Sequence, residues 1–367
     1  MKDVIIIGGG IGGSAAALRA AQNGMKAVWI LGSKFTRKRS RSQWVVNLDN
    51  IIGFHEDIIK DQVQKTLRNG GFPDAAALVE SEHYHINNRA IIRNTLERIK
   101  EGYPDLEIIE EEVLSLIRAS SGFEVSTSSQ SFSGVAVVLA TGVMDQQPYL
   151  RKKGKSGRVE ESPKWIYPFA NREQVLYCIR CEGHLTKDDT VAVLGHTDVA
   201  AELAMMLHER YGIKVYVLTN GEKPVISENR KKILEKYSIV VIPTLIANFL
   251  GDGVKQLRGF VFENGDSVEV KFALVSLGLN RVYNDLARQV SARLMDQNQT
   301  EEKRHIWIDY KGETSVENLF VVGDAAKRDD EPVMKQVYTA QEYAVRAVDT
   351  IDSRRRKRMR EIVLKKN

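Results

Sequence analysis

Two cysteines, three positions apart, are the residues of this sequence best suited to redox chemistry. The stretch Tyr177-Cys178-Ile179-Arg180-Cys181-Glu182 contains a C-x-x-C motif. At the start of a helix, this spacing puts both sulfurs on one face within bonding reach. The positive end of the helix and the Arg180 guanidinium favour the thiolate, which is the species that exchanges with disulfides. Glu182 is placed to supply or remove a proton beside the leaving thiolate.

Other uses of the cysteine pair stay open at this point. The chain has only two cysteines, so it is not a secreted scaffold held together by several disulfides. A zinc site would need two further ligands, for which His184 and His196 are the conceivable residues. There is no second C-x-x-C and no paired His-x-x-x-His. Two buried, inert cysteines are the remaining alternative.

Length and composition indicate a two-domain globular protein. The 367 residues are 43% hydrophobic and 28% charged, which is ordinary for such proteins. No run of about 18 uncharged apolar residues occurs, so we expect no membrane-spanning segment and no membrane as a partner. The amino terminus enters the apolar stretch Val4 to Ile7 directly, without the pattern of a signal peptide. We therefore expect a cytoplasmic protein.

The net charge of +5 comes from the carboxyl terminus. Residues 354–366 carry eight basic side chains and one acidic one, so the rest of the chain is slightly acidic. Further basic clusters span residues 34–41 and 151–158. Solvated loops and a frayed terminus are one interpretation, and a docking surface for an acidic protein is another. No aromatic residues alternate with the basic ones, which argues against nucleic acid as a partner.

The first glycine-rich motif predicts a dinucleotide site. Glycines at positions 8, 10 and 13 of Gly8-Gly9-Gly10-Ile11-Gly12-Gly13 satisfy G-x-G-x-x-G between an apolar stretch and an alanine-rich one. Gly8 permits the tight turn, Gly10 leaves room for a pyrophosphate, and Gly13 lets the helix pack on the strand. After the second strand, Leu31-Gly32-Ser33 offers no acidic residue for the adenosine ribose, so that contact is unassigned.

A second glycine motif, Gly195-His196-Thr197-Asp198, is altered. Thr197 stands at the central glycine position and puts a Cβ where a pyrophosphate would lie. After the next strand, Thr219-Asn220-Gly221 has no arginine for a 2′-phosphate, and the nearest arginines are Arg210 and Arg230. A nucleotide-like fold kept as a scaffold is therefore favoured over an NADPH site.

Two β-α-β openings predict the fold class: α/β, with two Rossmann-like, three-layer nucleotide-binding domains. We expect a discontinuous first domain over residues 1–145 and 273–352. The second domain, over 146–272, carries the cysteine pair. We expect a helix over Val337 to Ile351, and a separate basic tail over 353–367.

The order of these motifs resembles the low-molecular-weight thioredoxin reductases. The resemblance rests on the strand with Gly8–Gly13, then Ala140-Thr141-Gly142, then the cysteine pair before a second β-α-β unit, and finally Gly323-Asp324. It covers about residues 3–351. The resemblance implies a homodimeric FAD flavoprotein that reduces a thioredoxin-like protein.

The resemblance also implies roles for individual residues. Cys178 and Cys181 match the dithiol that takes electrons from the flavin, and Glu182 matches the acidic proton donor. The residues implied to bind FAD match the family's pyrophosphate loop, the turn that closes the FAD domain, the ribityl-side aspartate motif and the segment beside the isoalloxazine. In that order they are Gly8, Gly10 and Gly13; Thr141 and Gly142; Gly323 and Asp324; and Lys335, Gln336 and Val337.

Departures from the family pattern concern the electron donor. Lys34-Phe35-Thr36-Arg37 replaces the usual Gly-Gly-Gln stretch, and the NADPH loop carries Thr197. These losses resemble the deeply branching members of the family that do not use NADPH, some of which take electrons from ferredoxin. We expect such a flavoprotein, with an acidic donor such as ferredoxin. An NADPH-dependent thioredoxin reductase and a flavin redox sensor without turnover are the alternatives.

Overall fold

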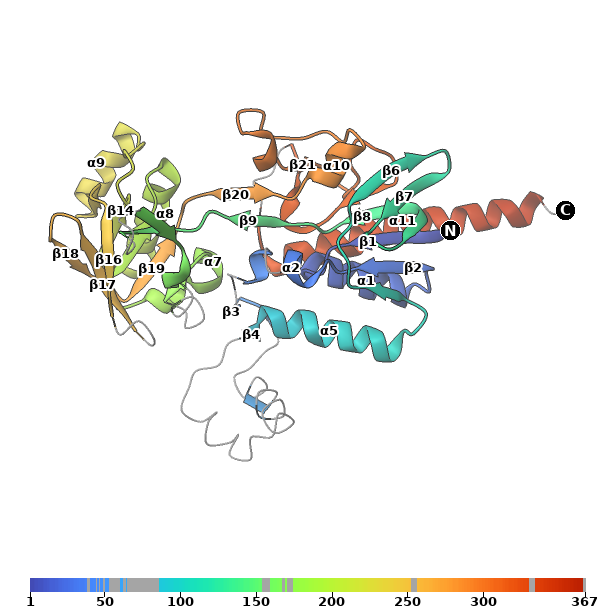
Figure 1. Cartoon of the computed structure of the whole chain (residues 1–367), viewed down its shortest axis with the longest axis horizontal. Helices are drawn as coiled ribbons and strands as arrows, with labels where there is room; N and C mark the ends of the chain where they lie inside the picture. Colours follow the sequence, from blue (N-terminus) through green and yellow to red (C-terminus); the bar gives the residue numbers. More distant parts are fainter. Residues whose placement is uncertain are drawn as a thin grey trace. The chain divides into compact units, whose positions relative to one another are not determined.

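The computed structural model describes residues 1–37, 40–43, 45, 47–48, 50–52, 60–61, 64, 86–153, 159–166, 169, 174–251, 256–329 and 334–365. Residues 38–39 and 154–158, which belong to the two internal basic clusters, lie outside this set. The chain divides into two compact units (Figure 1). Unit 1 comprises Met1–Gln43, Asn88–Asp145 and Leu279–Asn367, and unit 2 comprises Trp44–Asn87 and Gln146–Gly278.

Unit 1 is built on a mainly parallel sheet. Its strands run in the order β5 (Glu107–Ile109), β2 (Ala27–Ile30), β1 (Lys2–Ile7) and β8 (Ser131–Leu139), and β22 (Leu319–Val321) also pairs with β8. All these pairs are parallel, as expected for strands joined by helical crossovers. The first half of β8 pairs with β7 (Gly122–Ser126) in the antiparallel sense, and β7 pairs in the same sense with β6 (Ser115–Ala119).

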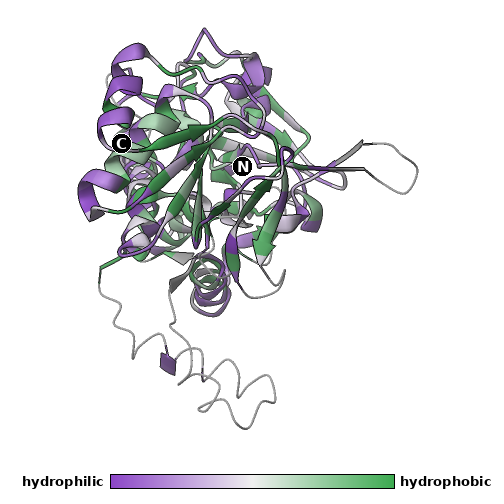
Figure 2. Ribbon diagram, turned by 90° about the vertical axis from the view of Figure 1, so that its left-hand side faces the viewer, coloured by the Kyte–Doolittle hydropathy of each residue, from purple (hydrophilic) through white to green (hydrophobic). Residues whose placement is uncertain are grey.

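Alternate residues of β1 supply the two cores of unit 1. Val4 and Ile6 pack with α1 (Ile11–Gln22), α5 (Asn88–Gly102) and α11 (Val337–Lys365). Ile5 and Ile7 point to the opposite face, where α10 (Asp285–Gln289) and the residues around Ile306 cover the sheet. A strand buried on both faces must be apolar throughout, which explains the uninterrupted run from Val4 to Ile7. In Figure 2 the strands are coloured mainly as hydrophobic, and the helices carry hydrophilic faces.

Smaller elements complete unit 1. They are α2 (Lys34–Arg37), η1 (Arg41–Gln43), β9 (Val143–Asp145) paired with β20 (Leu279–Val282), η4 (Glu301–Lys303), β21 (Ile306–Trp307) paired with β23 (Ala326–Lys327), and η5 (Gly323–Ala325).

Unit 2 contains a second parallel sheet, ordered β12 (Val175–Leu176), β19 (Phe272–Val275), β13 (Val191–Leu194), β14 (Val215–Leu218) and β15 (Val240–Ile242). Its core includes residues of α8 (Asp198–Tyr211) and α9 (Glu228–Lys236). The other elements are β3 (Asn47–Leu48) with β4 (Ile86–Asn87), β10 (Leu150–Lys153) with β11 (Val159–Ser162), η2 (Lys164–Ile166), α7 (Ile179–Glu182), η3 (Gly183–Thr186), and the antiparallel sheet β16 (Ile246–Gly251), β17 (Leu257–Phe262) and β18 (Ser267–Glu269).

These units differ from the expected boundaries at three places. Residues 44–87 group with unit 2, where Asn50 lies beside Cys181. The chain returns to unit 1 at Leu279 instead of at residue 273, because Phe272–Val275 is the strand β19 of the second sheet. α11 continues to Lys365 instead of ending near Ile351, so the described part of the basic tail is a helical extension of unit 1.

Candidate functional site

The predicted flavin motifs of unit 1 meet where its parallel strands end. A Cβ on Gly8 would lie 2.3 Å from the Ala140 carbonyl oxygen, which places the loops after β1 and β8 in contact. A Cβ on Gly12 would lie 3.2 Å from Val322 Cγ2 and 3.6 Å from the Gly323 nitrogen. Ligands of open α/β sheets bind at this carboxyl edge, between diverging loops. The structure therefore brings together three motifs that are more than a hundred residues apart.

Each of the three glycines of the first motif is glycine for a different physical reason. Gly8 has φ +124°, a conformation that side chains rarely adopt, and Trp29 Nε1 donates to its carbonyl at 2.9 Å. A Cβ on Gly13 would lie 1.9 Å from that same carbonyl oxygen, so the helix packs directly on the turn. A Cβ on Gly10 would meet nothing within 4 Å. Gly8 and Gly13 are required by the fold, whereas Gly10 keeps a space open.

The open space at Gly10 lies at the amino end of α1. Gly10 caps this 12-residue helix without a side-chain hydrogen bond, and the first turn contains no acidic residue. The first backbone N–H groups of such a helix are free to bind an anion. Ser14 in the same turn is 3% exposed, and its Oγ is buried without a partner among the described residues. These residues fit a pyrophosphate such as that of FAD.

No carboxylate follows β2 to hold an adenosine ribose. Instead, the Ser33 hydroxyl pairs with the Thr36 hydroxyl at 3.1 Å, and Arg37 pairs with Glu110 at 2.7 Å. Glu110 follows the neighbouring strand β5 directly. An acidic residue at this edge thus comes from a different strand, and the sequence around β2 did not indicate it.

Asp324 takes part in a buried ion-pair network that the sequence did not reveal. Arg41 Nε donates to Asp145 Oδ2 at 2.7 Å, and Arg41 Nη1 donates to Asp324 Oδ2 at 3.2 Å. Burial alone would lower the pKa of the Arg41 guanidinium, but the two carboxylates outweigh it and raise the pKa above its ordinary value. Arg41 belongs to the basic cluster of residues 34–41, interpreted above as solvated loops or as a docking surface; the structure shows it largely buried and paired with Asp145 and Asp324.

Lys335 adds a second cation to this network. Burial and the neighbouring Arg41 lower the pKa of the Lys335 ammonium, while Asp145 and Asp324 partly oppose that shift. The network therefore contains two basic and two acidic groups. Gln336 is buried, and its Nε2 donates to the Lys335 carbonyl at 3.0 Å; Val337 begins α11. The structure thus places Lys335 near Asp324, on the segment that leads into α11.

Thr141 and Gly142 close the turn after β8. The Thr141 hydroxyl donates to the Tyr283 carbonyl at 2.6 Å, and the Tyr283 N–H donates to the Gly142 carbonyl at 3.0 Å. Gly142 has φ +68°, in the left-handed region that favours glycine. Both residues therefore connect the end of β8 to the strand that returns from unit 2, and the Thr141 hydroxyl is engaged in this connection.

In unit 2, Cys178 and Cys181 form a disulfide with their Cα atoms 5.3 Å apart. Cys178 caps the amino end of α7, and its Sγ accepts a hydrogen bond from the Cys181 N–H at 3.2 Å. A donor aimed at this sulfur favours its thiolate once the disulfide is reduced. The two cysteines are 8% and 3% exposed. The pair predicted from spacing at a helix start is therefore present in the fold.

Glu182 lies directly behind the disulfide. Its Oε2 accepts hydrogen bonds from the backbone N–H groups of Tyr177, at 3.2 Å, and Cys178, at 3.3 Å. The residue is 4% exposed. Its carboxylate thus holds the backbone turn that presents Cys178, in addition to the proton-transfer role expected from the sequence.

Asn50 was missed by the sequence analysis. Its Nδ2 lies 3.8 Å from Cys181 Sγ, which is within the range of a weak hydrogen bond to sulfur. Asn50 and Cys181 are 131 positions apart. No local pattern links them, so only the folded chain could bring them together.

The amino end of α8, where a second dinucleotide would bind, carries the acidic side chain of Asp198 in its first turn and is paired with a neighbouring segment of the chain. Val225 pairs with Thr197 as an isolated bridge and donates its N–H to the His196 carbonyl at 2.7 Å. Asp198 in the first turn accepts the Ser227 N–H at 2.7 Å. The nearest candidate arginine, Arg230, is paired with Asp198 at 3.2 Å and with Glu202 at 3.1 Å. This helix end therefore contrasts with the open end of α1.

Two further properties concern metal binding and membrane-spanning helices. Among the described residues, no group of three or more His, Cys, Asp or Glu side chains is arranged to hold a metal ion. Within the same part of the chain, no helix is long and apolar enough to cross a membrane.

Together, the two Rossmann-like units and the disulfide define an oxidoreductase with the thioredoxin reductase architecture. Residues 2–344 match the family described as pyridine nucleotide-disulphide oxidoreductase, and the chain belongs to that family. It is 24% identical over 327 residues to a component of the alkyl hydroperoxide reductase of Pseudomonas aeruginosa. That match covers 88% of this chain and 53% of the relative, so the chain spans about half the length of the curated protein it matches.

Solved structures with the same fold include two thioredoxin reductases. The enzyme from Streptococcus pyogenes aligns with a TM-score of 0.71 and 18% identity, over 96% of this chain and 97% of that one. The enzyme from Giardia duodenalis aligns with a TM-score of 0.69 and 18% identity, over 96% of this chain and 98% of that one. At these identities the likeness establishes the fold. The expected α/β fold class and thioredoxin-reductase-like architecture are confirmed.

Proposed function

We propose that this chain is an FAD-dependent thiol-disulfide oxidoreductase that passes electrons to Cys178–Cys181 and then to a thioredoxin-like protein. The observation that carries the proposal is the disulfide at the start of α7, with an N–H donor aimed at Cys178 Sγ. FAD would supply two-electron transfer when bound. The open end of α1 at Gly10, the turn at Gly8 and Gly13, and Asp324 would hold it. Thr141, Gly142, Gly323, Lys335, Gln336 and Val337 would complete its surroundings.

The disulfide step requires two electrons and two protons to yield two thiols. One cysteine thiolate then attacks the partner's disulfide and forms a mixed disulfide. The second cysteine attacks that bond, which releases the partner as a dithiol and restores the Cys178–Cys181 disulfide. The Cys181 N–H stabilises the thiolate of Cys178, and Glu182 would deliver or accept a proton at this pair.

We further propose that NADPH is not the direct donor. Thr197 puts a Cβ at the pyrophosphate position and pairs with Val225, the Asp198 carboxylate stands in the first turn of α8, and Arg230 is paired with two carboxylates. A dinucleotide would have to displace these contacts. The donor would be a small acidic redox protein such as ferredoxin. The protein would act in the cytoplasm as a homodimer.

Anaerobic reduction of the purified flavoprotein tests the donor. We expect FAD to copurify and its absorbance at about 450 nm to bleach with reduced ferredoxin, but not with NADPH or NADH at matched concentration. Rapid bleaching by NADPH would establish an NADPH-dependent thioredoxin reductase and overturn the proposed donor.

Cysteine variants test the disulfide chemistry. One redox-active disulfide per chain should titrate with a dithiol, and Cys178→Ser or Cys181→Ser should abolish reduction of thioredoxin while the flavin remains reducible. Glu182→Gln keeps a side-chain oxygen for the backbone N–H groups but loses the titratable proton, so its pH profile separates proton transfer from structural support. If photochemically reduced flavin never reduces thioredoxin, the chain is a flavin sensor without turnover.

A further inference from the structure

The last turns of α11 form an exposed and strongly basic helix end. α11 runs without a break from Val337 to Lys365, but its last buried residue is Ile351. Every residue from Lys357 to Lys365 is exposed. In Figure 1 this end, marked C, extends past the strands of unit 1. These nine residues contain four basic side chains and one acidic one.

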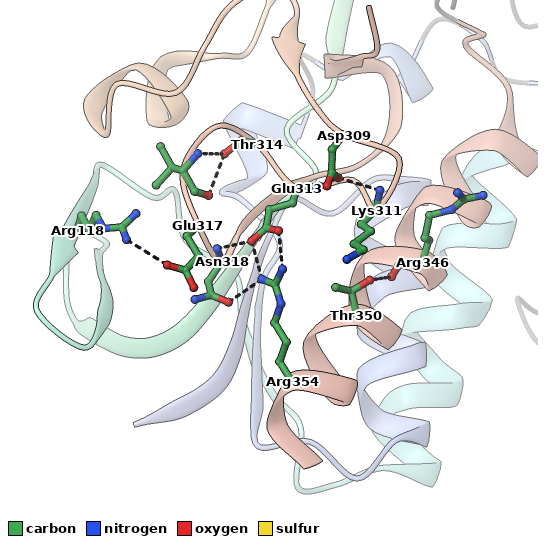
Figure 3. Close-up of polar contacts among 11 residues, drawn as sticks. Arg118, Asp309, Lys311, Glu313, Thr314, Glu317, Asn318, Arg346, Thr350 and Arg354 are labelled. Atoms are coloured by element: carbon green, nitrogen blue, oxygen red, sulfur yellow. Dashed lines mark hydrogen bonds and ion pairs between the residues drawn. The ribbon is translucent and has the colours of Figure 1, made fainter. Parts of the chain in front are cut away.

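Two arginines fix the helix just before this end. Arg354 donates to both carboxylate oxygens of Glu313 at 2.6 Å and to Asn318 Oδ1 at 3.0 Å (Figure 3). Arg355 lies 3.6 Å from Asp3 Oδ2 and donates to the Gly24 carbonyl at 3.4 Å. Within the described part of the chain, side chains 357–365 form no hydrogen bond or ion pair. α11 is thus attached firmly up to Arg355, and the following turns are held only by helix continuity.

The exposed end carries an apolar stripe, and a fourth exposed apolar residue, Leu364, lies on the opposite face. Met359, Ile362 and Val363 are spaced i, i+3 and i+4, so they form one apolar stripe, and each is more than half exposed. Arg358 and Lys365 lie beside Ile362 on one edge of the stripe, because they are four residues before it and three after it. Arg360 lies beside Val363 on the other edge. Cations therefore border the apolar stripe on both sides.

We propose that residues 357–365 bind the surface of an anionic phospholipid bilayer. An interfacial helix buries its apolar stripe at the headgroup boundary while flanking Lys and Arg side chains reach the phosphates. A second copy of this helix is disfavoured as the occupant because two cationic ends repel each other. Cations on both edges of a stripe only three residues long fit a flat charged surface better than a narrow acidic groove. The segment lies on the surface of the membrane and does not span it.

Vesicle sedimentation tests this binding with the full-length protein. Vesicles of phosphatidylcholine with about one third phosphatidylglycerol should retain the protein at low salt, and retention should weaken as salt rises to the physiological range. Vesicles of phosphatidylcholine alone should not retain it. No difference between the two kinds of vesicle would overturn the proposal.

Two variants separate a specific site from general charge. Changing Lys357, Arg358, Arg360 and Lys365 to Gln should lower the partition coefficient by about a hundredfold or more. The matched control changes four exposed lysines of unit 2 to Gln, namely Lys223, Lys231, Lys232 and Lys236, and should bind as the wild type does. Equal losses in both variants would show that the net charge alone is responsible and would overturn the proposal.

The apolar stripe distinguishes a bilayer from an acidic protein. Met359→Ser, Ile362→Ser and Val363→Ser together should reduce vesicle binding at least tenfold, because the cations remain but nothing enters the headgroup boundary. Binding to polyglutamate should be unchanged in this triple variant. Unchanged vesicle binding would indicate a purely electrostatic site for acidic chains and would refute the bilayer as the partner. Circular dichroism and unfolding temperature verify that all variants fold.

Discussion

Removal of the Arg41 guanidinium is the sharpest test of the network around Asp324. The side chains of Arg41, Asp145 and Asp324 are only 15%, 13% and 20% exposed. In Arg41→Gln both carboxylates would lose the guanidinium that hydrogen-bonds to them, and only the Lys335 ammonium would remain near them. Breaking a buried ion pair in this way costs about 3–5 kcal/mol, because the remaining charge is poorly solvated.

Arg19 supplies a matched control in the same unit. Like Arg41, it donates two hydrogen bonds to carboxylate oxygens, but both belong to one residue, Asp349, at 2.7 and 3.0 Å. The side chains of this pair are 36% and 43% exposed, so Arg19→Gln should cost no more than about 1 kcal/mol. Thermal unfolding of the flavin-free protein should show the difference, because about 1 kcal/mol shifts the midpoint by about 2–4 °C in a unit of this size.

A double-mutant cycle identifies the interaction itself. Arg41→Gln combined with Asp145→Asn should be at least about 1 kcal/mol more stable than the sum of the two single changes predicts. The affinity for FAD, measured by fluorescence titration, should fall in Arg41→Gln and stay unchanged in Arg19→Gln. Strict additivity, or equal shifts for the two arginine variants, would refute the buried network.

Three further predictions follow from the loops and from α11. Gly10→Ala should fold normally but weaken FAD binding, whereas Gly13→Ala should unfold at a clearly lower temperature because its Cβ would lie 1.9 Å from the Gly8 carbonyl oxygen; the reverse order would contradict the assigned roles. Thr197→Gly should not restore flavin reduction by NADPH in stopped-flow mixing, since Val225 still covers that helix end. Burial by itself would raise the pKa of Glu313. Hydrogen bonds from Arg354 and the Asn318 N–H outweigh burial and lower that pKa below its ordinary 4.5. The Glu313 carboxylate therefore contributes its full stabilisation above pH 4.5, and this contribution is lost as the pH falls through the folded-state pKa. Glu313→Gln should flatten the acid side of a plot of the free energy of unfolding against pH. An unchanged plot would count against this role of Glu313.

Features that depend on neighbouring residues could be predicted from the amino-acid sequence alone. Apolar runs such as Val4 to Ile7 predicted strands, and the glycine spacing predicted the turn at Gly8. The C-x-x-C spacing predicted the disulfide, because residues three apart at a helix start lie on the same side. These patterns can be recognised in the sequence because strand periodicity, positive φ and helix geometry are set within a few residues.

Contacts between groups that are distant in the sequence could not be predicted from it. Arg41 is one of several basic residues in its stretch of sequence, and nothing local indicates its pairing with Asp145 and Asp324. Val225 and Asn50 carry no local signal for their contacts with Thr197 and Cys181. Such contacts depend on how strands and loops converge after the chain has folded. Helix ends differ for the same reason: α1 and α8 both follow a glycine turn, but a Cβ on Gly10 would meet nothing within 4 Å, whereas the backbone of Val225 pairs with Thr197.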